Sequence, residues 1–262
     1  MTLVRIEKRD RIAIVAFDSG SPANPLSLQL LRELTAAAGT FADDTSTAAV
    51  ILTGRPENFT VGFDLKDTEY ADLRRAGIAR QHAALRIGTR LCRAWQEIPA
   101  LTVSAIEGWC VGGGVALAVA TDLRVVGEHA RCYVPEIERG MNMSWGSVPR
   151  IVNLVGPARA KRIVLLAEKI DARQSLEWGL ADKVAADGTT AEAALAFAQR
   201  AASLPPIAMR MCKQDIDAYA NALAPASSHA DLDQFLLAQQ SEDFSEAVDA
   251  FLEKRDARFT GS

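Results

Sequence analysis

The stretch VSAIEGWCVGGGVALAVATDL, residues 103–123, decides how the rest of this chain is interpreted. The apolar run 101–106 predicts a buried strand, and Gly112, Gly113 and Gly114 open an apolar segment that predicts a buried helix. Three glycines at a strand-to-helix junction cost conformational entropy, so they indicate a backbone that comes very close to another group. The free N–H groups at a helix N-terminus favour a negative oxygen. We therefore interpret the junction as one half of an oxyanion hole.

The composition is that of an ordinary globular protein with one large domain and ample material for a core. The chain has 262 residues, of which 49% are hydrophobic and 24% charged. A net charge of -4 offers no basic footprint, so we expect no nucleic-acid partner. No apolar run is long enough to span a membrane, and no charged leader precedes an apolar segment at the N-terminus. We expect a cytoplasmic protein with no membrane partner.

The cysteines and histidines are scattered along the chain. They are Cys92, Cys110, Cys132, Cys212, His82, His129 and His229. Their spacing matches neither a disulfide framework nor a zinc site, so we expect reduced cysteines that fill the core and no metal.

Hydrophobic periodicity and turn residues predict an α/β chain with a helical end. The predicted strands are 3–9, 11–17, 48–53, 101–106, 122–126 and 131–134. One predicted helix begins after Ser27 and ends near Phe41, and another ends before Pro99. Further helices are predicted over 112–120, 147–155, 157–167, 173–178, 190–203, 207–219, 228–240 and 242–254. Residues 136–146 are predicted as a loop. A strand, a glycine-bearing loop and a helix occur once after residue 48 and again after residue 101. This repetition favours stacked strand–strand–helix units over a nucleotide-binding sheet.

The opening stretch resembles, position by position, the signature of the crotonase family, the enoyl-CoA hydratases and isomerases. The matching positions are Val103, Ser104, Ile106, Glu107, Gly108, Gly112, Gly113, Gly114, Val119, Thr121, Asp122 and Leu123. The likeness extends from the strands near residue 4 to the tail AFLEKRDARFTG, residues 250–261. It implies a crotonase spiral over residues 1–200 that carries an acyl-CoA site. It also implies an all-helical region, 201–262, through which family members form homotrimers or dimers of trimers.

The resemblance implies that the substrate is a coenzyme A thioester and that no other cofactor is needed. The loop FTVGFDL, residues 59–65, matches the family's other oxyanion loop, so the backbone N–H groups of Phe63 and Gly113 would hold the thioester oxygen. The neighbouring residues implied in substrate binding are Val61, Gly62, Asp64, Leu65, Lys66, Leu26 and Gly112. The alternative is that the glycines serve turns and packing.

Glu136 is the predicted acid/base, because Pro135-Glu136-Ile137 stands where the family carries a catalytic glutamate. A carboxylate among apolar neighbours and glycine-rich backbone would have a raised pKa and exchange protons near neutral pH. The alternative is an exposed loop glutamate.

The chain departs from the family pattern at Ala116, where typical hydratases carry a second glutamate. Activation of water by two glutamates is therefore not available from these positions. Double-bond isomerases and hydroxycinnamoyl-CoA hydratase-lyases also use a single glutamate, and the runs GWCVGGG and VGFDLKDTEY resemble the latter. Hydration, isomerisation and lyase chemistry stay open, as does a non-catalytic acyl-CoA binder.

A second departure is the run MNMSWGS, residues 141–147, in place of a proline- and glycine-rich loop. Met141, Met143 and Trp145 either line an acyl pocket or fill the core beneath the loop. Glu138 and Ser144 are candidate auxiliary polar groups.

Several basic residues are candidate partners for the coenzyme A phosphates. They are Lys66, Arg55, Lys254 and Arg255, with Arg74, Arg75 and Arg80 as weaker candidates. The alternative for each is a solvated surface charge.

Overall fold

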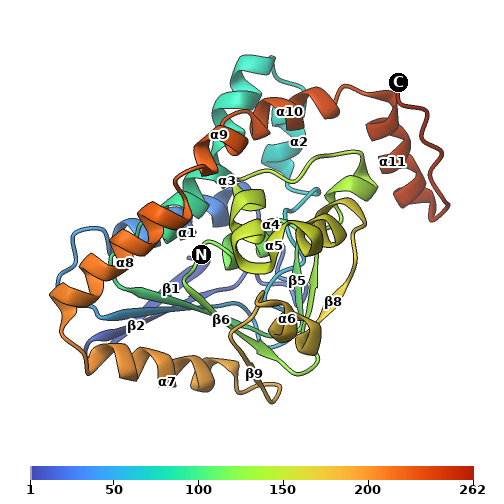
Figure 1. The fold of residues 1–262 in the computed structure, drawn as a ribbon. Coiled ribbons are helices and arrows are strands. Elements are labelled where there is room, and N and C mark those ends of the chain that lie inside the picture. The colour runs from blue at the N-terminus through green and yellow to red at the C-terminus, as the bar shows by residue number, and fades with distance from the viewer. Residues whose placement is uncertain (1) are drawn as a thin grey trace.

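Two β-sheets organise residues 2–262, the part of the chain that this computed structural model describes, with backbone alone at residues 251 and 252 (Figure 1). The larger sheet has the order β1 (Val4–Arg9), β2 (Ile12–Phe17), β3 (Ala49–Thr53), β4 (Leu101–Ile106), β6 (Leu123–Gly127) and β9 (Lys183–Ala185). The smaller sheet has the order β5 (Trp109–Val111), β7 (Arg131–Tyr133) and β8 (Ile170–Asp171). Strands β1 and β2 are antiparallel, as are β7 and β8, and all other pairs are parallel.

The predicted hairpin and the helix that follows it are confirmed. Val4 pairs with Phe17 and Arg9 with Ile12 across the antiparallel pair. Ser27 caps α1 (Leu28–Gly39) by accepting the Leu30 N–H at 3.1 Å, which satisfies one of the free donors of the first turn.

The predicted strand–strand–helix repeat is also confirmed. The chain leaves the large sheet at the end of β3, β4 and β6, and each time it then pairs with the small sheet. Strand β4 leads into β5 and β6 leads into β7, while Thr60 after β3 forms a single parallel bridge with Cys110 of β5. Strands β5, β8 and β9 escaped prediction because segments of two or three residues carry no readable alternation.

Most predicted helices are confirmed with small changes in their bounds. The helices after α1 are α2 (Thr68–Arg74), α3 (Ile78–Gln96), α4 (Gly113–Ala118), α5 (Ser147–Leu165), α6 (Ala172–Trp178), α7 (Thr190–Ala202), α8 (Pro206–Ala220), α9 (Ala224–Ser228), α10 (Asp231–Ala238) and α11 (Glu242–Glu253). The two helices predicted over 147–167 adjoin in α5 at Gly156, whose φ of +77° breaks the helical geometry. The loop prediction for 136–146 is wrong at its start, because a 3-10 turn, η1 (Glu136–Arg139), begins there. The helix predicted over 228–240 is shorter, because α9 precedes it and α10 begins at Asp231.

Helices cover both faces of the large sheet. Helix α7, below the sheet in Figure 1, packs Ala194, Ala198 and Ala201 against Ile51 and Val103, and its alanines allow close approach. The opposite face packs against the main core, which includes the fully buried Leu31, Leu34 and Trp95 of α1 and α3.

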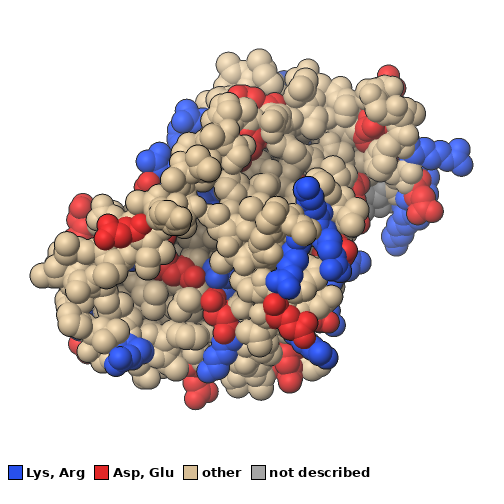
Figure 2. Space-filling model, in the orientation of Figure 1, with Lys and Arg blue, Asp and Glu red and all other residues tan. Residues whose placement is uncertain are grey.

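The C-terminal helices α8 to α11 run along the outside of this body, with α11 at its far end (Figure 1). Within residues 2–262, no helix combines the length and the apolar character needed to cross a membrane. Basic and acidic side chains are interspersed on the face drawn in Figure 2.

Candidate active site

The two glycine-bearing loops singled out in the sequence lie side by side. Thr60 donates its N–H to Trp109 O at 2.9 Å, and Val111 donates to Thr60 O at 3.0 Å, so the first loop pairs with β5. The chain then reaches Gly62, where an added Cβ would lie 3.8 Å from the Gly113 nitrogen. The start of α4 and the loop at 59–65 therefore form one continuous backbone surface.

The amides of Phe63 and Gly113 are the two predicted oxyanion donors. Leu26, fully buried, holds the first loop on both sides of Phe63: its N–H donates to Gly62 O at 2.8 Å and its carbonyl accepts from Asp64 N at 3.0 Å. Neither the Phe63 N–H nor the Gly113 N–H donates to any acceptor within residues 2–262. Within the described part of the chain, both amides thus keep a free donor, which the predicted role requires.

Gly112 lets the predicted base lie against the start of α4. Its φ is +52°, a left-handed conformation that disfavours residues with a Cβ, and its N–H donates to Tyr133 O at 2.8 Å. A Cβ at Gly112 would lie only 2.5 Å from Glu136 Oε1. A glycine is therefore required here for two independent reasons, backbone conformation and close approach.

Glu136 begins the η1 turn and turns its carboxylate inward. Its Oε2 is fully enclosed and has no hydrogen-bond partner within the described residues. Burial raises the pKa of Glu136 from its usual 4.5 to about 7, although its own backbone N–H and Arg139 act in the opposite direction. The exposed-loop interpretation is therefore wrong for this side chain. A carboxyl group with such a pKa can both accept and return a proton near neutral pH.

A mostly apolar cavity of about 660 Å³, opening included, joins these groups. Six predicted site residues line it, namely Phe63, Leu65, Gly113, Glu136, Met141 and Trp145. Met143 and Ser144 line it too, so the loop at 141–147 does form its wall, and Ala116 presents a methyl group where the family carries its second glutamate.

The prediction missed the parts of the wall that come from helices. These residues include Leu31, Tyr70, Leu85, Gly88, Leu232 and Phe235. Apolar residues at helical spacing predict burial but do not distinguish a cavity wall from a packed core. Leu232 and Phe235 lie in α10, so the cavity extends across the boundary placed near residue 200 and includes the helical C-terminal region.

The Trp145 indole packs against two glycines, whose lack of a side chain leaves room for the ring. Added Cβ atoms at Gly88 and Gly113 would lie 2.1 Å and 2.7 Å from the indole, so the ring occupies the space between α3 and the start of α4. Trp145 itself has a φ of +62°, which is unusual for a residue with a side chain. Asp231 and Arg150 secure this turn, because Asp231 Oδ2 accepts from Gly146 N at 2.6 Å and Arg150 Nη1 donates to Trp145 O at 3.1 Å.

The other predicted substrate-binding residues do not line the cavity. They are Leu26, Val61, Gly62, Asp64, Lys66 and Gly112. Val61 and Lys66 are exposed, and Asp64 Oδ1 accepts from the Lys66 N–H at 2.9 Å, which shapes the rim of the loop. Their contact with substrate stays a prediction.

Two candidate phosphate partners already have other partners. Arg55 forms ion pairs with Asp18 at 2.7 Å and with Glu57 at 3.2 Å. Arg255 forms ion pairs with Glu246 at 2.5 Å and with Glu253 at 2.6 Å. Glu138, a candidate auxiliary group, is exposed and accepts from the Tyr133 hydroxyl instead of entering the cavity. These contacts weigh against the predicted roles of Arg55, Arg255 and Glu138.

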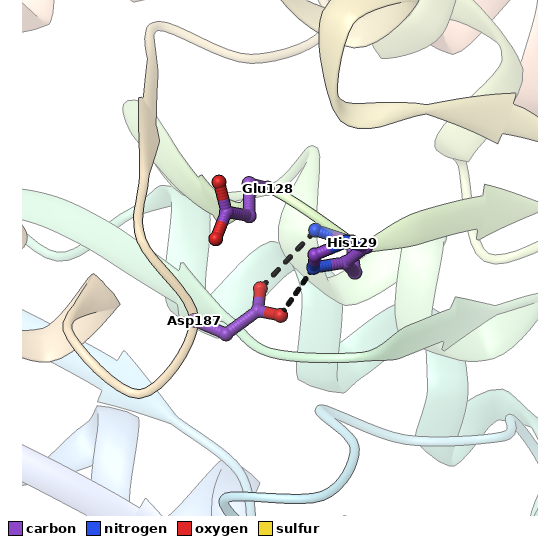
Figure 3. A group of neighbouring side chains, drawn as sticks. All are labelled: Glu128, His129 and Asp187. Carbon is purple, nitrogen blue, oxygen red and sulfur yellow. Dashed lines mark hydrogen bonds and ion pairs between the residues drawn. The ribbon is translucent and has the colours of Figure 1, made fainter.

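One cluster of possible metal ligands was not predicted, because one of its members lies far from the other two in the sequence. Figure 3 shows Glu128 and His129 facing Asp187, which comes from another segment of the chain. The ligand atoms of the three residues lie within 4.8 Å of one another. His129 Nδ1 already pairs with Asp187 Oδ2 at 2.6 Å, and all three side chains are exposed. None of them lines the cavity. The contacts are those of a surface ion pair that fastens the turn after β6 to the segment after β9, and we assign no metal to them.

Comparisons of the sequence and of the structure with known proteins point to the same family. A family model described as "Enoyl-CoA hydratase/isomerase" matches residues 7–262. The chain is 30% identical to 2,3-dehydroadipyl-CoA hydratase of Escherichia coli (strain K12), with 100% of each chain covered. It is 28% identical to short-chain-enoyl-CoA hydratase of Clostridium acetobutylicum, with 96% of this chain and 95% of that protein covered. The crystal structure of an enoyl-CoA hydratase from Mycobacterium avium subsp. paratuberculosis K-10 superposes with a TM-score of 0.86 at 22% identity, covering 98% of each chain, which confirms the predicted fold.

Proposed function

Since this chain belongs to the enoyl-CoA hydratase/isomerase family, we propose that it is an acyl-CoA enzyme that hydrates a 2-enoyl thioester through an enolate. The observation that carries the proposal is the enclosed Glu136 carboxylate, without a partner in the described residues, in the cavity that Phe63 and Gly113 also line. Hydration is the reaction in the names of both relatives, the short-chain-enoyl-CoA and 2,3-dehydroadipyl-CoA hydratases.

The Phe63 and Gly113 amides would bind the thioester oxygen as it gains negative charge. Only the main chain donates, so the side chain of Phe63 is free to pack against Tyr70, with ring centroids 4.8 Å apart. Removing one donor of this kind typically costs about 2.7–4 kcal/mol of transition-state stabilisation. The positions of the two loops therefore matter more for this step than the side chains they carry.

Glu136 would move the protons. One carboxylate can take a proton from the nucleophile and return it to the α carbon, because its pKa of about 7 suits both directions. Ala116 favours a second candidate reaction, because a single base is also sufficient to shift a double bond by moving one proton between two carbons. Isomerisation, and the hydratase-lyase reaction of hydroxycinnamoyl-CoA, would also pass through a thioester enolate or dienolate whose oxygen the same two amides would bind.

The coenzyme A portion would leave the cavity past Leu65. This residue lines the cavity and is nevertheless 49% exposed, so it marks the opening. Lys66 follows it, is exposed, and makes no ion pair within residues 2–262. It is our first candidate for contact with the phosphates, as a charge-assisted donor.

We also propose that the chain works as a homotrimer or a dimer of trimers. Helix α8 exposes Ile207, Met211, Ile216 and Tyr219, and several exposed apolar residues on one helix favour contact with another chain.

The test of the function is α-proton exchange, measured by proton NMR of butyryl-CoA in D₂O. This saturated thioester reports enolate formation without a double bond. We expect the wild-type protein to exchange the α protons and Glu136→Ala to exchange them about 10²–10⁴-fold more slowly.

Calorimetric titration with butyryl-CoA completes the test. Equal exchange by wild type and Glu136→Ala would remove Glu136 as the base. Binding without exchange by the wild type would favour a non-catalytic acyl-CoA binder, and absence of both would contradict the acyl-CoA assignment.

A further inference from the structure

Two side-chain polar atoms in the described part of the chain are enclosed and have no hydrogen-bond partner, and both belong to residues that line the same cavity. They are Glu136 Oε2 and Asn142 Oδ1. Enclosed polar atoms are almost always paired, since an unpaired one has lost its hydrogen bonds to water without replacement. Two unpaired acceptors on residues that line one cavity point to a ligand that donates hydrogen bonds to both.

The orientation of the Asn142 amide follows from its other contact. Its Nδ2 donates to the backbone carbonyl of Asp231 at 2.9 Å, at the start of α10. Asp231 is itself fixed, because its side chain accepts from Gly146 N. The donor end of the amide is therefore committed to the protein, and the end that is left over, Oδ1, can only accept.

A water molecule is the ligand that matches this pair of acceptors in a hydratase. A water molecule that donates one hydrogen to Glu136 and the other to Asn142 keeps its lone pairs free to attack a carbon atom. Ala116 offers only a methyl group at the position where a second carboxylate would otherwise bind that water. We propose that Asn142 positions the attacking water in place of the second glutamate, an inference that rests on the function proposed above.

The hydration step then balances with one carboxylate. The water oxygen bonds to the β carbon, the π electrons move to the thioester oxygen between the Phe63 and Gly113 amides, and the water proton passes to Glu136. The enolate next takes that proton at the α carbon, which restores the carboxylate and leaves a 3-hydroxyacyl thioester. Asn142 accepts the hydrogen that stays on the oxygen throughout. An amide takes no proton under these conditions, so Asn142 is a positioning residue.

This role separates two reactions that share the enolate. Exchange of the α protons of butyryl-CoA needs Glu136 and the two amides but no attacking water. Hydration of crotonyl-CoA needs all of these and an oriented water as well. A substitution that removes only the Asn142 acceptor should therefore slow hydration and spare exchange, whereas general damage to the site should slow both.

The experiment compares both rates in wild type and Asn142→Leu, which keeps the approximate size of the side chain and removes the acceptor together with the Nδ2 donor to Asp231 O, so the control variant must lose a hydrogen bond of the same kind. We expect hydration, followed by loss of the enoyl absorbance, to fall about 10²-fold, the usual size of a positioning effect. We expect the exchange rate to stay near that of wild type. Asn153→Ala is the matched control, because Asn153 Nδ2 donates to Ala220 O at 2.7 Å in the same manner but is exposed and lies outside the cavity.

The other outcomes are equally clear. A parallel fall in both rates for Asn142→Leu would assign Asn142 a structural role and overturn the inference, as would two unchanged rates. Wild type that exchanges butyryl-CoA but hydrates none of crotonyl-, hexenoyl- and cinnamoyl-CoA would overturn the inference and leave the enolate function standing. Wild type that does neither would contradict the proposed function itself.

Discussion

At the scale of single residues, Gly112 and Glu136 are linked by direct contact. The hydrogen on the Gly112 Cα faces Glu136 Oε1, and a methyl group there would lie 2.5 Å from that oxygen. The position of the base is therefore set by the residue that precedes the oxyanion amide. This contact makes the geometry of the site sensitive to one methyl group.

Gly112→Ala should reduce α-proton exchange by at least about 10²-fold, because displacement of a catalytic group by about 1 Å typically costs that much. Gly20→Ala is the matched control. Gly20 also has a positive φ, +82°, but a Cβ there meets nothing within 4 Å, so only the backbone strain of about 1–2 kcal/mol should appear. Exchange rates and urea unfolding of both variants check this. Equal exchange by the two variants would contradict the contact argument.

The pH dependence of exchange should report Glu136. Burial disfavours the charged carboxylate and places its pKa at about 7. Below that pH the group is protonated and accepts no proton, so the exchange rate of the free enzyme should fall as the pH decreases, by about tenfold per unit below about pH 6, and level off above about pH 8. Rates measured over this range in wild type check the sign. A flat profile, or the same profile in Glu136→Gln, would exclude Glu136 as the titrating base.

At the scale of elements, α3 and the loop before α5 fit together around one side chain. Helix α3 carries Gly88 where the Trp145 indole lies, and α10 carries the Asp231 carboxylate that fixes the turn. The turn places a residue with a large side chain at positive φ, and contacts from α3, α4, α5 and α10 stabilise it. The shape of the cavity is thus decided by contacts between helices rather than by the loop at 141–147 alone.

Gly88→Ala should destabilise the protein by about 1–3 kcal/mol and change acyl-CoA binding, because a Cβ 2.1 Å from the indole forces the ring to move. Gly39→Ala in α1 is the control, since a Cβ there meets nothing within 4 Å, and it should be neutral or slightly stabilising. The double variant Gly88→Ala/Trp145→Leu should recover part of the lost stability. Urea unfolding and butyryl-CoA titration check this, and a Gly88→Ala protein as stable as wild type would refute the fit.

At the scale of the whole molecule, the C-terminal helices have two sets of contacts. Helix α10 contributes Leu232 and Phe235 to the cavity, while α8 presents apolar side chains to the outside. The same region thus closes the cavity and carries the exposed apolar residues that we propose for assembly. Such an arrangement would connect the proposed oligomer to the integrity of the cavity.

Met211→Asp combined with Ile216→Asp should reduce the oligomer to smaller species, because charged groups on a buried interface are costly to desolvate. Met211 and Ile216 are 61% and 65% exposed in the single chain, so the folded subunit should tolerate the change. Leu176→Asp, at an exposed apolar position on α6, serves as the control. Sedimentation equilibrium gives the mass of each species. An unchanged mass for the α8 variant would place the interface elsewhere.

Features that depend on neighbouring residues could be predicted from the sequence alone. The Ser27 cap, the hairpin before Phe17 and the glycine junction at 112–114 are local patterns, and the structure confirms each of them. The pairing of the two glycine loops was also predictable, but only because the family resemblance supplied the long-range alignment.

The meeting of distant residues in the cavity could be seen only once the chain was folded. Asn142 reaches Asp231 across 89 positions, and Gly88 accommodates Trp145 from another helix, although neither pair has a recognisable spacing. Periodicity tells which side of an element is buried but not what lies against it. The enclosure of Glu136, and hence its raised pKa, is likewise a product of packing, because desolvation depends on every segment around the carboxylate.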